Sequence, residues 1–202
     1  MGLKRTVPPN EGLTVISQEE ARQQIRLGPN DGSLDADVMR LVRAATEVVE
    51  ETTWRALITQ TWRLTLDQFP CRIVLPRPPL QSVTSLQYVD ENGALQTLGS
   101  TKYLVTLDAE PGRIEPAYNE VWPTTRCQQD AVRVTYVAGY GAAASDVPQG
   151  IRQAILLILA DWFRNREANI TGTIIAPVPM SAAWLLAGYR VEPDETWFHL
   201  AE

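Results

Sequence analysis

Residues 34–67 read LDADVMRLVRAATEVVEETTWRALITQTWRLTLD, and the spacing of the apolar residues changes along this stretch. In its first part, leucine, valine and alanine recur every three or four residues, which predicts a helix with one apolar face. From Trp62 to Leu66, apolar and polar residues alternate, which is typical of a half-buried strand. The chain therefore contains a helical zone that is followed by a β zone.

The residues before this change, 1–57, are predicted to be helical. Ser17 and Glu20 form a capping box, in which the side chain of each accepts a hydrogen bond from the backbone amide of the other at a helix start. This first helix is expected to end at Gly28-Pro29, because proline cannot continue the hydrogen-bond ladder. The longer helix of residues 34–56 follows, and its polar face carries charges of both signs.

Residues 58–138 are predicted to form a small antiparallel sheet or an open barrel. Besides the strand around Trp62, we expect strands at residues 71–75, 82–89, 94–98, 102–107 and 131–138. Asp90-Glu91-Asn92-Gly93 predicts a hairpin turn, because Asn-Gly tolerates positive φ. Half of the 14 prolines fall between these runs. Because proline lacks the amide that a central ladder needs, the strands must be short.

Residues 147–190 are predicted to be helical again. Pro148 suits the first position of a helix. The helix after it is apolar on nearly every side, so it must be covered by its own domain or by neighbouring subunits. A short helix from Ser181 to Tyr189 follows a loop that contains prolines. We therefore expect an α+β protein with three parts: a helical bundle of residues 1–57 and 147–190, a small antiparallel β insertion of residues 58–138, and an acidic tail with aromatic residues at 191–202.

Composition restricts the classes of function. The 202 residues carry 18 Lys and Arg against 24 Asp and Glu, a formal net charge of −6, which argues against a duplex DNA reader with a basic face. The one histidine is His199, so acid–base chemistry by histidine would depend on a residue near the C-terminus. Cys71 and Cys127 lack the spacing of a zinc site and are expected to be buried thiols. No stretch is predicted to cross a membrane.

Residues 139–144, Gly-Tyr-Gly-Ala-Ala-Ala, fit the glycine-rich pattern of dinucleotide-binding sites. That pattern requires a helix that opens on the glycines within a βαβ unit. Here Ser145-Asp146-Val147-Pro148 intervenes, and the preceding strand belongs to an antiparallel meander. A turn from sheet to helix explains these glycines better. The sequence therefore predicts no cofactor, no metal site and no enzymatic activity.

A set of short segments provides a further signal through its order and spacing. The segments are Glu51–Leu57, Thr59–Trp62, Leu66–Pro70, Leu75–Val83, Tyr88–Asp90 with Gly93, Val132–Tyr136, Gly139–Gly141, Val147-Pro148, Ile151, Gln153–Ile155, Arg166-Glu167, Leu185-Leu186 and Tyr189-Arg190. Together they resemble the head–tail connector (adaptor) proteins of tailed bacteriophages and gene transfer agents, in the longer form with a β insertion. The resemblance covers residues 14–190.

The resemblance implies a non-enzymatic structural protein of the virion neck, at the head–tail junction, which is present in the host cytoplasm during assembly. It also implies a dodecameric ring of this chain that docks on the portal protein, meets a tail-side connector or stopper protein and extends the DNA channel towards the tail. An acidic channel would let DNA pass without specific binding, because like charges repel. Two other functions remain as alternatives: a monomeric β-sheet binding module of unknown ligand, and an enzyme whose motifs are not recognised.

Three sets of residues are predicted to act in such a ring. Docking on the portal or another partner is assigned to C-terminal residues, since aromatic residues are enriched at interface hot spots: Trp184, Leu185, Leu186, Tyr189, Arg190, Trp197 and Phe198. Contacts between subunits are assigned to the apolar helix: Ile151, Ile155, Leu156, Ile158, Leu159 and Trp162. Acidic residues of the helix at 34–56 are predicted to face the channel: Asp35, Asp37, Glu47, Glu50 and Glu51.

Overall fold

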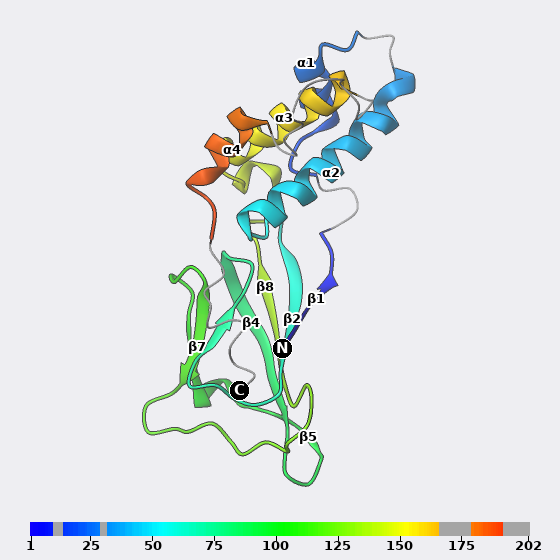
Figure 1. Cartoon of the computed structure of the whole chain (residues 1–202). Coiled ribbons are helices and arrows are strands. Elements are labelled where there is room, and N and C mark those ends of the chain that lie inside the picture. Colours follow the sequence, from blue (N-terminus) through cyan, green and yellow to red (C-terminus); the bar gives the residue numbers. More distant parts are fainter. Residues whose placement is uncertain (10–13, 29–31, 166–178, 192–202) are drawn as a thin grey trace. The chain divides into compact units, whose positions relative to one another are not determined.

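The computed structural model describes residues 1–9, 14–28, 32–165 and 179–191, which form two compact units (Figure 1). We call residues 1–9 and 54–140 the β unit, and residues 14–28, 32–53, 141–165 and 179–190 the helical unit. In the described part of the chain, every α-helix lies in the helical unit and every strand lies in the β unit. The protein is therefore α+β, as the sequence predicts.

The β unit contains two antiparallel sheets. The larger sheet has the order β1 (Gly2–Val7), β2 (Gln60–Leu66), β8 (Val132–Ala138), β4 (Leu80–Val89) and β5 (Leu95–Thr97). The smaller sheet has the order β3 (Ile73–Leu75), β7 (Gly112–Pro116) and β6 (Tyr103–Thr106). Pairing of β2 with β8 is unbroken from Gln60 opposite Ala138 to Leu66 opposite Val132. In Figure 1, β2, β8 and β4 run side by side as the centre of the larger sheet.

The core of the β unit follows from the alternation that the sequence shows. Leu64, Val132, Val134 and Tyr136 are fully buried, and the intervening residues of β8 are half-buried. Residues of both sheets, including Ile73 and Ile114, belong to this one core. The buried Tyr136 hydroxyl donates a hydrogen bond of 2.8 Å to the carbonyl oxygen of Pro76, which satisfies the polar atom that burial removes from water.

Two strands of the β unit were not predicted. Residues 1–57 are not wholly helical, because Gly2–Val7 pair with β2 as an edge strand. Strand β7 contains one large apolar residue between a glycine and a proline, which is a weak strand pattern. It forms because its two neighbours, β3 and β6, pair with it on either side and Ile114 is fully buried. Both strands depend on partners that are distant along the chain.

The helical unit contains α1 (Gln18–Ile25), α2 (Asp35–Thr53), α3 (Gln149–Arg164) and α4 (Met180–Ala187), with 3₁₀ turns at Gly32–Leu34 and Ala144–Asp146. The predicted capping box is confirmed: the Ser17 amide donates to the Glu20 carboxylate at 3.0 Å, and the Glu20 amide donates to the Ser17 hydroxyl at 3.2 Å. Helix α1 ends earlier than predicted, with Arg26 in the left-handed conformation.

The apolar face predicted for the longer helix is present in α2. Val38, Val42, Ala45 and Val49 are fully buried, and they follow the spacing of one helix face. Helices α1, α2 and α4 all contact α3, which is therefore the centre of the helical unit. Among the described helices, none is long and apolar enough to cross a membrane.

The two cysteines differ from the expectation of buried thiols. Both Cys71 and Cys127 are free and exposed. Cys71 precedes β3 in a bend, and Cys127 lies between β7 and β8. Cysteine is often buried because its side chain is small and weakly polar, but these two positions fall in connections at the surface.

An ion pair in the β unit provides a test of its stability. Arg55, 7% exposed, donates a hydrogen bond of 2.5 Å to the Glu110 carboxylate, and its guanidinium lies 5.9 Å from the centre of the Tyr140 ring. The hydrogen bond from Arg55 lowers the pKa of Glu110. Loss of the carboxylate would leave a buried guanidinium without this partner, which is costly.

Replacement of Glu110 by glutamine is therefore expected to lower the free energy of unfolding by about 1 kcal/mol at neutral pH. A lowered pKa stabilises the fold above the ordinary carboxyl value of about 4.3, and this contribution is lost as the pH falls through the lowered value. Urea unfolding at neutral and acidic pH measures the difference. Glu115→Gln is the control, because Glu115 and Arg72 are half exposed and 3.5 Å apart. The difference in free energy of unfolding between the wild-type chain and Glu110→Gln should become smaller at acidic pH. A difference that stays the same in acid would contradict the prediction.

Candidate functional site: exposed surfaces of the helical unit

Helix α4 presents an apolar surface to solvent. Its sequence, MSAAWLLA, contains no charged residue, and only Ala182 and Leu186, one turn apart, are buried. Met180 is 77% exposed and Trp184 is 78% exposed. Large apolar side chains that remain exposed together on one short helix mark an interaction surface rather than a core face.

The other residues predicted to dock on a partner divide into three groups. Leu186 is 1% exposed and packs inside the helical unit, so its assignment to docking is wrong. Leu185 and Arg190 are exposed, and Tyr189 is half-buried beside Gly150, where an added Cβ would lie 3.0 Å from the tyrosine hydroxyl. Trp197 and Phe198 lie outside the described residues, as does the histidine, His199, which is not part of the predicted docking set.

Most of the apolar residues of α3 form the core of their own unit. Ile151, Ile155, Ile158 and Leu159 are fully buried within this chain. They therefore have no surface with which to contact another subunit, which corrects their predicted role. The sequence left open whether the helix is covered by its own domain or by neighbours, and α1, α2 and α4 supply most of the cover. Leu156 and Trp162 remain half-buried and are the members of this set that another subunit can reach.

The acidic residues of α2 occupy different environments. The Asp35 carboxylate accepts hydrogen bonds from Arg22 and, at 2.7 Å, from the Gln18 side chain. Glu50 is 9% exposed, so it does not face an open channel in this conformation. Asp37, Glu47 and Glu51 are exposed, and Asp37 forms an ion pair of 3.0 Å with Arg40. Of the five predicted acidic residues, Asp37, Glu47 and Glu51 are thus the ones that remain exposed.

A cleft that the sequence analysis did not identify lies between α2 and α3. Its volume is about 350 Å³, and it is lined by Asp37, Arg40, Leu41, Trp162, Phe163 and Asn165. The start of α2 and the end of α3 supply these residues, which are more than a hundred positions apart in the chain. The signal available in the sequence was the pair of bulky aromatic residues at the end of α3, next to polar residues.

The glycine-rich segment has the turn geometry that its sequence favours. Strand β8 ends at Ala138, Gly139 has a φ of 135°, and α3 begins only at Gln149. The Ala143 amide donates a hydrogen bond of 2.9 Å to the Asp146 carboxylate, which closes a 3₁₀ turn before the helix. The glycines therefore do not open a helix, which is the feature that a dinucleotide site needs.

Comparison with known proteins gives a consistent class. No protein-family model matches the chain, and no curated protein matches it. A chain from the neck of an empty gene transfer agent particle, computed with C6 symmetry, matches with a TM-score of 0.79 and 26% identity, over 96% of this chain and 97% of that one. A chain from the virion of a native gene transfer agent particle matches with a TM-score of 0.78 and 25% identity, with the same coverage of both chains.

A third chain, from the neck of a native gene transfer agent particle computed with C12 symmetry, shares the fold with a TM-score of 0.76 and 23% identity. Taken together, the two likenesses of 25% identity or more support a place in the virion neck and a structural role in the virion. Within this class, they confirm the resemblance to the head–tail connector proteins that the order of the sequence segments indicates.

Proposed function

We propose that this chain forms a homo-oligomeric ring, which acts as the adaptor between the portal protein and the tail-side connector or stopper of the neck. The single observation that carries the proposal is the likeness to neck proteins over nearly the whole chain. The ring is supported by the symmetry with which those necks were computed, sixfold in one case and twelvefold in another. Twelve subunits is the stoichiometry that we propose.

Portal docking is proposed for exposed residues at the end of the helical unit. Leu185 and Arg190 are exposed, and they lie immediately before the C-terminal tail. An exposed apolar side chain and an exposed cation in one short segment suit a groove with an acidic edge on the partner. Glu47 and Glu51 on α2 are proposed to face the DNA channel, where carboxylates would repel phosphates and prevent specific binding.

Native mass spectrometry of the chain with the portal protein of the same particle tests the ring. We expect a complex in which about twelve copies of the chain join one portal, because each contact repeats around the axis. Negative-stain images should show a ring seated on one end of the portal. A chain that stays monomeric at high concentration with the portal present contradicts the proposal and favours a monomeric binding module.

A double variant tests the proposed docking on the portal separately from the ring. Leu185→Ser combined with Arg190→Glu is expected to reduce co-sedimentation with the portal by at least tenfold, because truncation of contact residues costs more than 1 kcal/mol at interface hot spots. The fold should be unchanged, since both side chains are exposed. The control is Arg164→Glu, a charge reversal at an exposed residue of α3. Full co-sedimentation of the double variant would place the docking surface elsewhere.

A further inference from the structure

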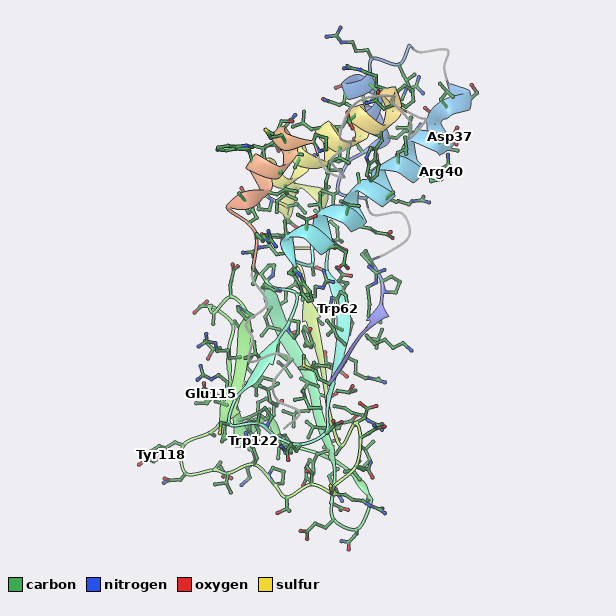
Figure 2. The ribbon with its side chains drawn as sticks, in the orientation of Figure 1. Asp37, Arg40, Trp62, Glu115, Tyr118 and Trp122 are labelled. Atoms are coloured by element: carbon green, nitrogen blue, oxygen red, sulfur yellow. The ribbon has the colours of Figure 1, made fainter. Side chains whose placement is uncertain are left out.

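The cleft between α2 and α3 has the lining of a socket for a flat aromatic side chain. Leu41, Trp162 and Phe163 are half-buried and supply the apolar part of the lining, whereas Asp37, Arg40 and Asn165 supply the polar part, which is the larger. Asp37 and Arg40 form an ion pair on its α2 side, and Figure 2 labels both along the first part of that helix. The volume of about 350 Å³ lies at the lower end of the range of pockets that hold compact ligands.

Helix α4 carries a side chain that matches this socket. Trp184 is 78% exposed, although it belongs to a helix whose other large residues include the buried Leu186. An exposed indole offers a large apolar face and one N–H donor. The cleft offers apolar side chains for the face, the Arg40 guanidinium for a cation–π contact, and the Asp37 carboxylate as an acceptor for the N–H.

We infer that Trp184 of one subunit inserts into the α2–α3 cleft of the next subunit of the ring. This inference rests on the proposed ring. It assigns Trp184 to the contact between copies of this chain. The sequence alone favours a contact of Trp184 with the portal. Trp162, predicted from the sequence to lie in the subunit interface, is then part of the socket.

The position of the two features within the helical unit fits a ring. Tyr189, just after α4, lies beside Gly150 at the start of α3, whereas the cleft contains Trp162 and Phe163 at the end of α3. A helix of this length extends for roughly 24 Å at 1.5 Å per residue. Trp184 on α4 and the cleft between α2 and α3 are two different surfaces of one subunit, so their contact is heterologous, and heterologous contacts generate a ring when the rotation between subunits closes.

Site-specific cross-linking tests the pairing. Cys71 and Cys127 are exposed, so both are first replaced by serine. In that background, Ala187→Cys places a thiol one turn from Trp184, and Asn165→Cys places one at the cleft. Both positions are exposed. A short bismaleimide should join the two variants when they are mixed in assembled rings, and should join neither variant to itself.

Truncation of the indole provides the second measurement. Trp184→Ala is expected to weaken each contact between subunits by ~30-fold, which corresponds to about 2 kcal/mol for a hot-spot tryptophan. The fold should be unchanged because the side chain is exposed. Tyr118→Ala is the matched control, since Tyr118 is 89% exposed on the β unit, and it should assemble as the wild-type chain does.

The outcomes separate this inference from the function on which it rests. Mixed cross-links together with weakened assembly of Trp184→Ala support the socket. A ring of normal stoichiometry without mixed cross-links, or with Ala187→Cys linked to itself, overturns the socket and leaves the proposed ring intact. Normal assembly of Trp184→Ala overturns the socket as well. A wild-type chain that stays monomeric with the portal present overturns both.

Discussion

Replacement of Gly139 by alanine is expected to destabilise the β unit by about 4 kcal/mol, the largest effect that we predict for a single substitution. Gly139 has a φ of 135°, a conformation that residues with a side chain rarely adopt. An added Cβ would also lie 2.7 Å from the backbone carbonyl of Ile58 and from the amide nitrogen of Thr59. Because both obstacles are backbone atoms, no side-chain rotation relieves the clash.

The hydrogen bonds of Gly139 strengthen this expectation. Its amide donates to the Pro79 carbonyl at 2.9 Å, and its carbonyl accepts from the Gln81 side chain at 2.7 Å. A shift of the backbone to accommodate the methyl group would stretch both bonds. Urea unfolding followed by circular dichroism measures the loss.

Gly188→Ala is the matched control for Gly139→Ala. Gly188, at the end of α4, has a φ of −74°, and an added Cβ would meet no atom within 4 Å. At such a position alanine stabilises by about 0.5 kcal/mol, because it restricts the unfolded chain. Equal stability of the two variants would show that the turn after β8 does not need glycine.

Replacement of Ile155 by alanine is expected to lower the free energy of unfolding by about 3 kcal/mol. Ile155 is fully buried at the centre of the helical unit, where α1, α2 and α4 contact α3. The substitution leaves a cavity and removes apolar area from the core. The loss should be the same at low and high protein concentration, because the side chain packs within its own chain.

The dependence on concentration distinguishes a core residue from an interface residue. A side chain that is buried only by a neighbouring subunit would contribute to stability in proportion to assembly, by mass action. Leu156→Ala is the comparison, since Leu156 is half-buried on the same helix; we expect a loss of about 1 kcal/mol in the monomer. If the loss in free energy of unfolding caused by Ile155→Ala disappears on dilution, Ile155 contacts another subunit, as the sequence predicts.

The corrections to the predicted sites have a common physical cause. Periodicity shows that Ile151, Ile155, Ile158 and Leu159 must be buried, but it does not show against what. The four are fully buried within this chain, where α1, α2 and α4 contact α3, so they are core residues. In the same way, the sequence pattern groups Glu50 and Leu186 with neighbouring residues that are exposed. The packing of the helical unit buries both of them.

The connector resemblance depended on many weak segments rather than on a catalytic motif. Such a signal is what the proposed function would leave, because a structural ring needs shape and surface rather than a fixed set of reacting groups. The socket that we propose for Trp184 shows what such a signal does not reveal, namely which distant residues meet in the folded chain. Asp37 and Arg40 are visible as an ion pair on one helix, but Trp162 and Phe163 join them only when the start of α2 meets the end of α3.

The sequence by itself determined the features that depend on near neighbours: the capping box at Ser17, the apolar face of α2, the turn at Gly139, and the order of helical and β zones. Tertiary structure alone decided that Gly2–Val7 and Gly112–Pro116 are strands, since each requires partners far along the chain. It also decided which apolar residues remain exposed on α4. Local patterns record backbone geometry and the need for burial, whereas the identity of the covering segment depends on long-range packing.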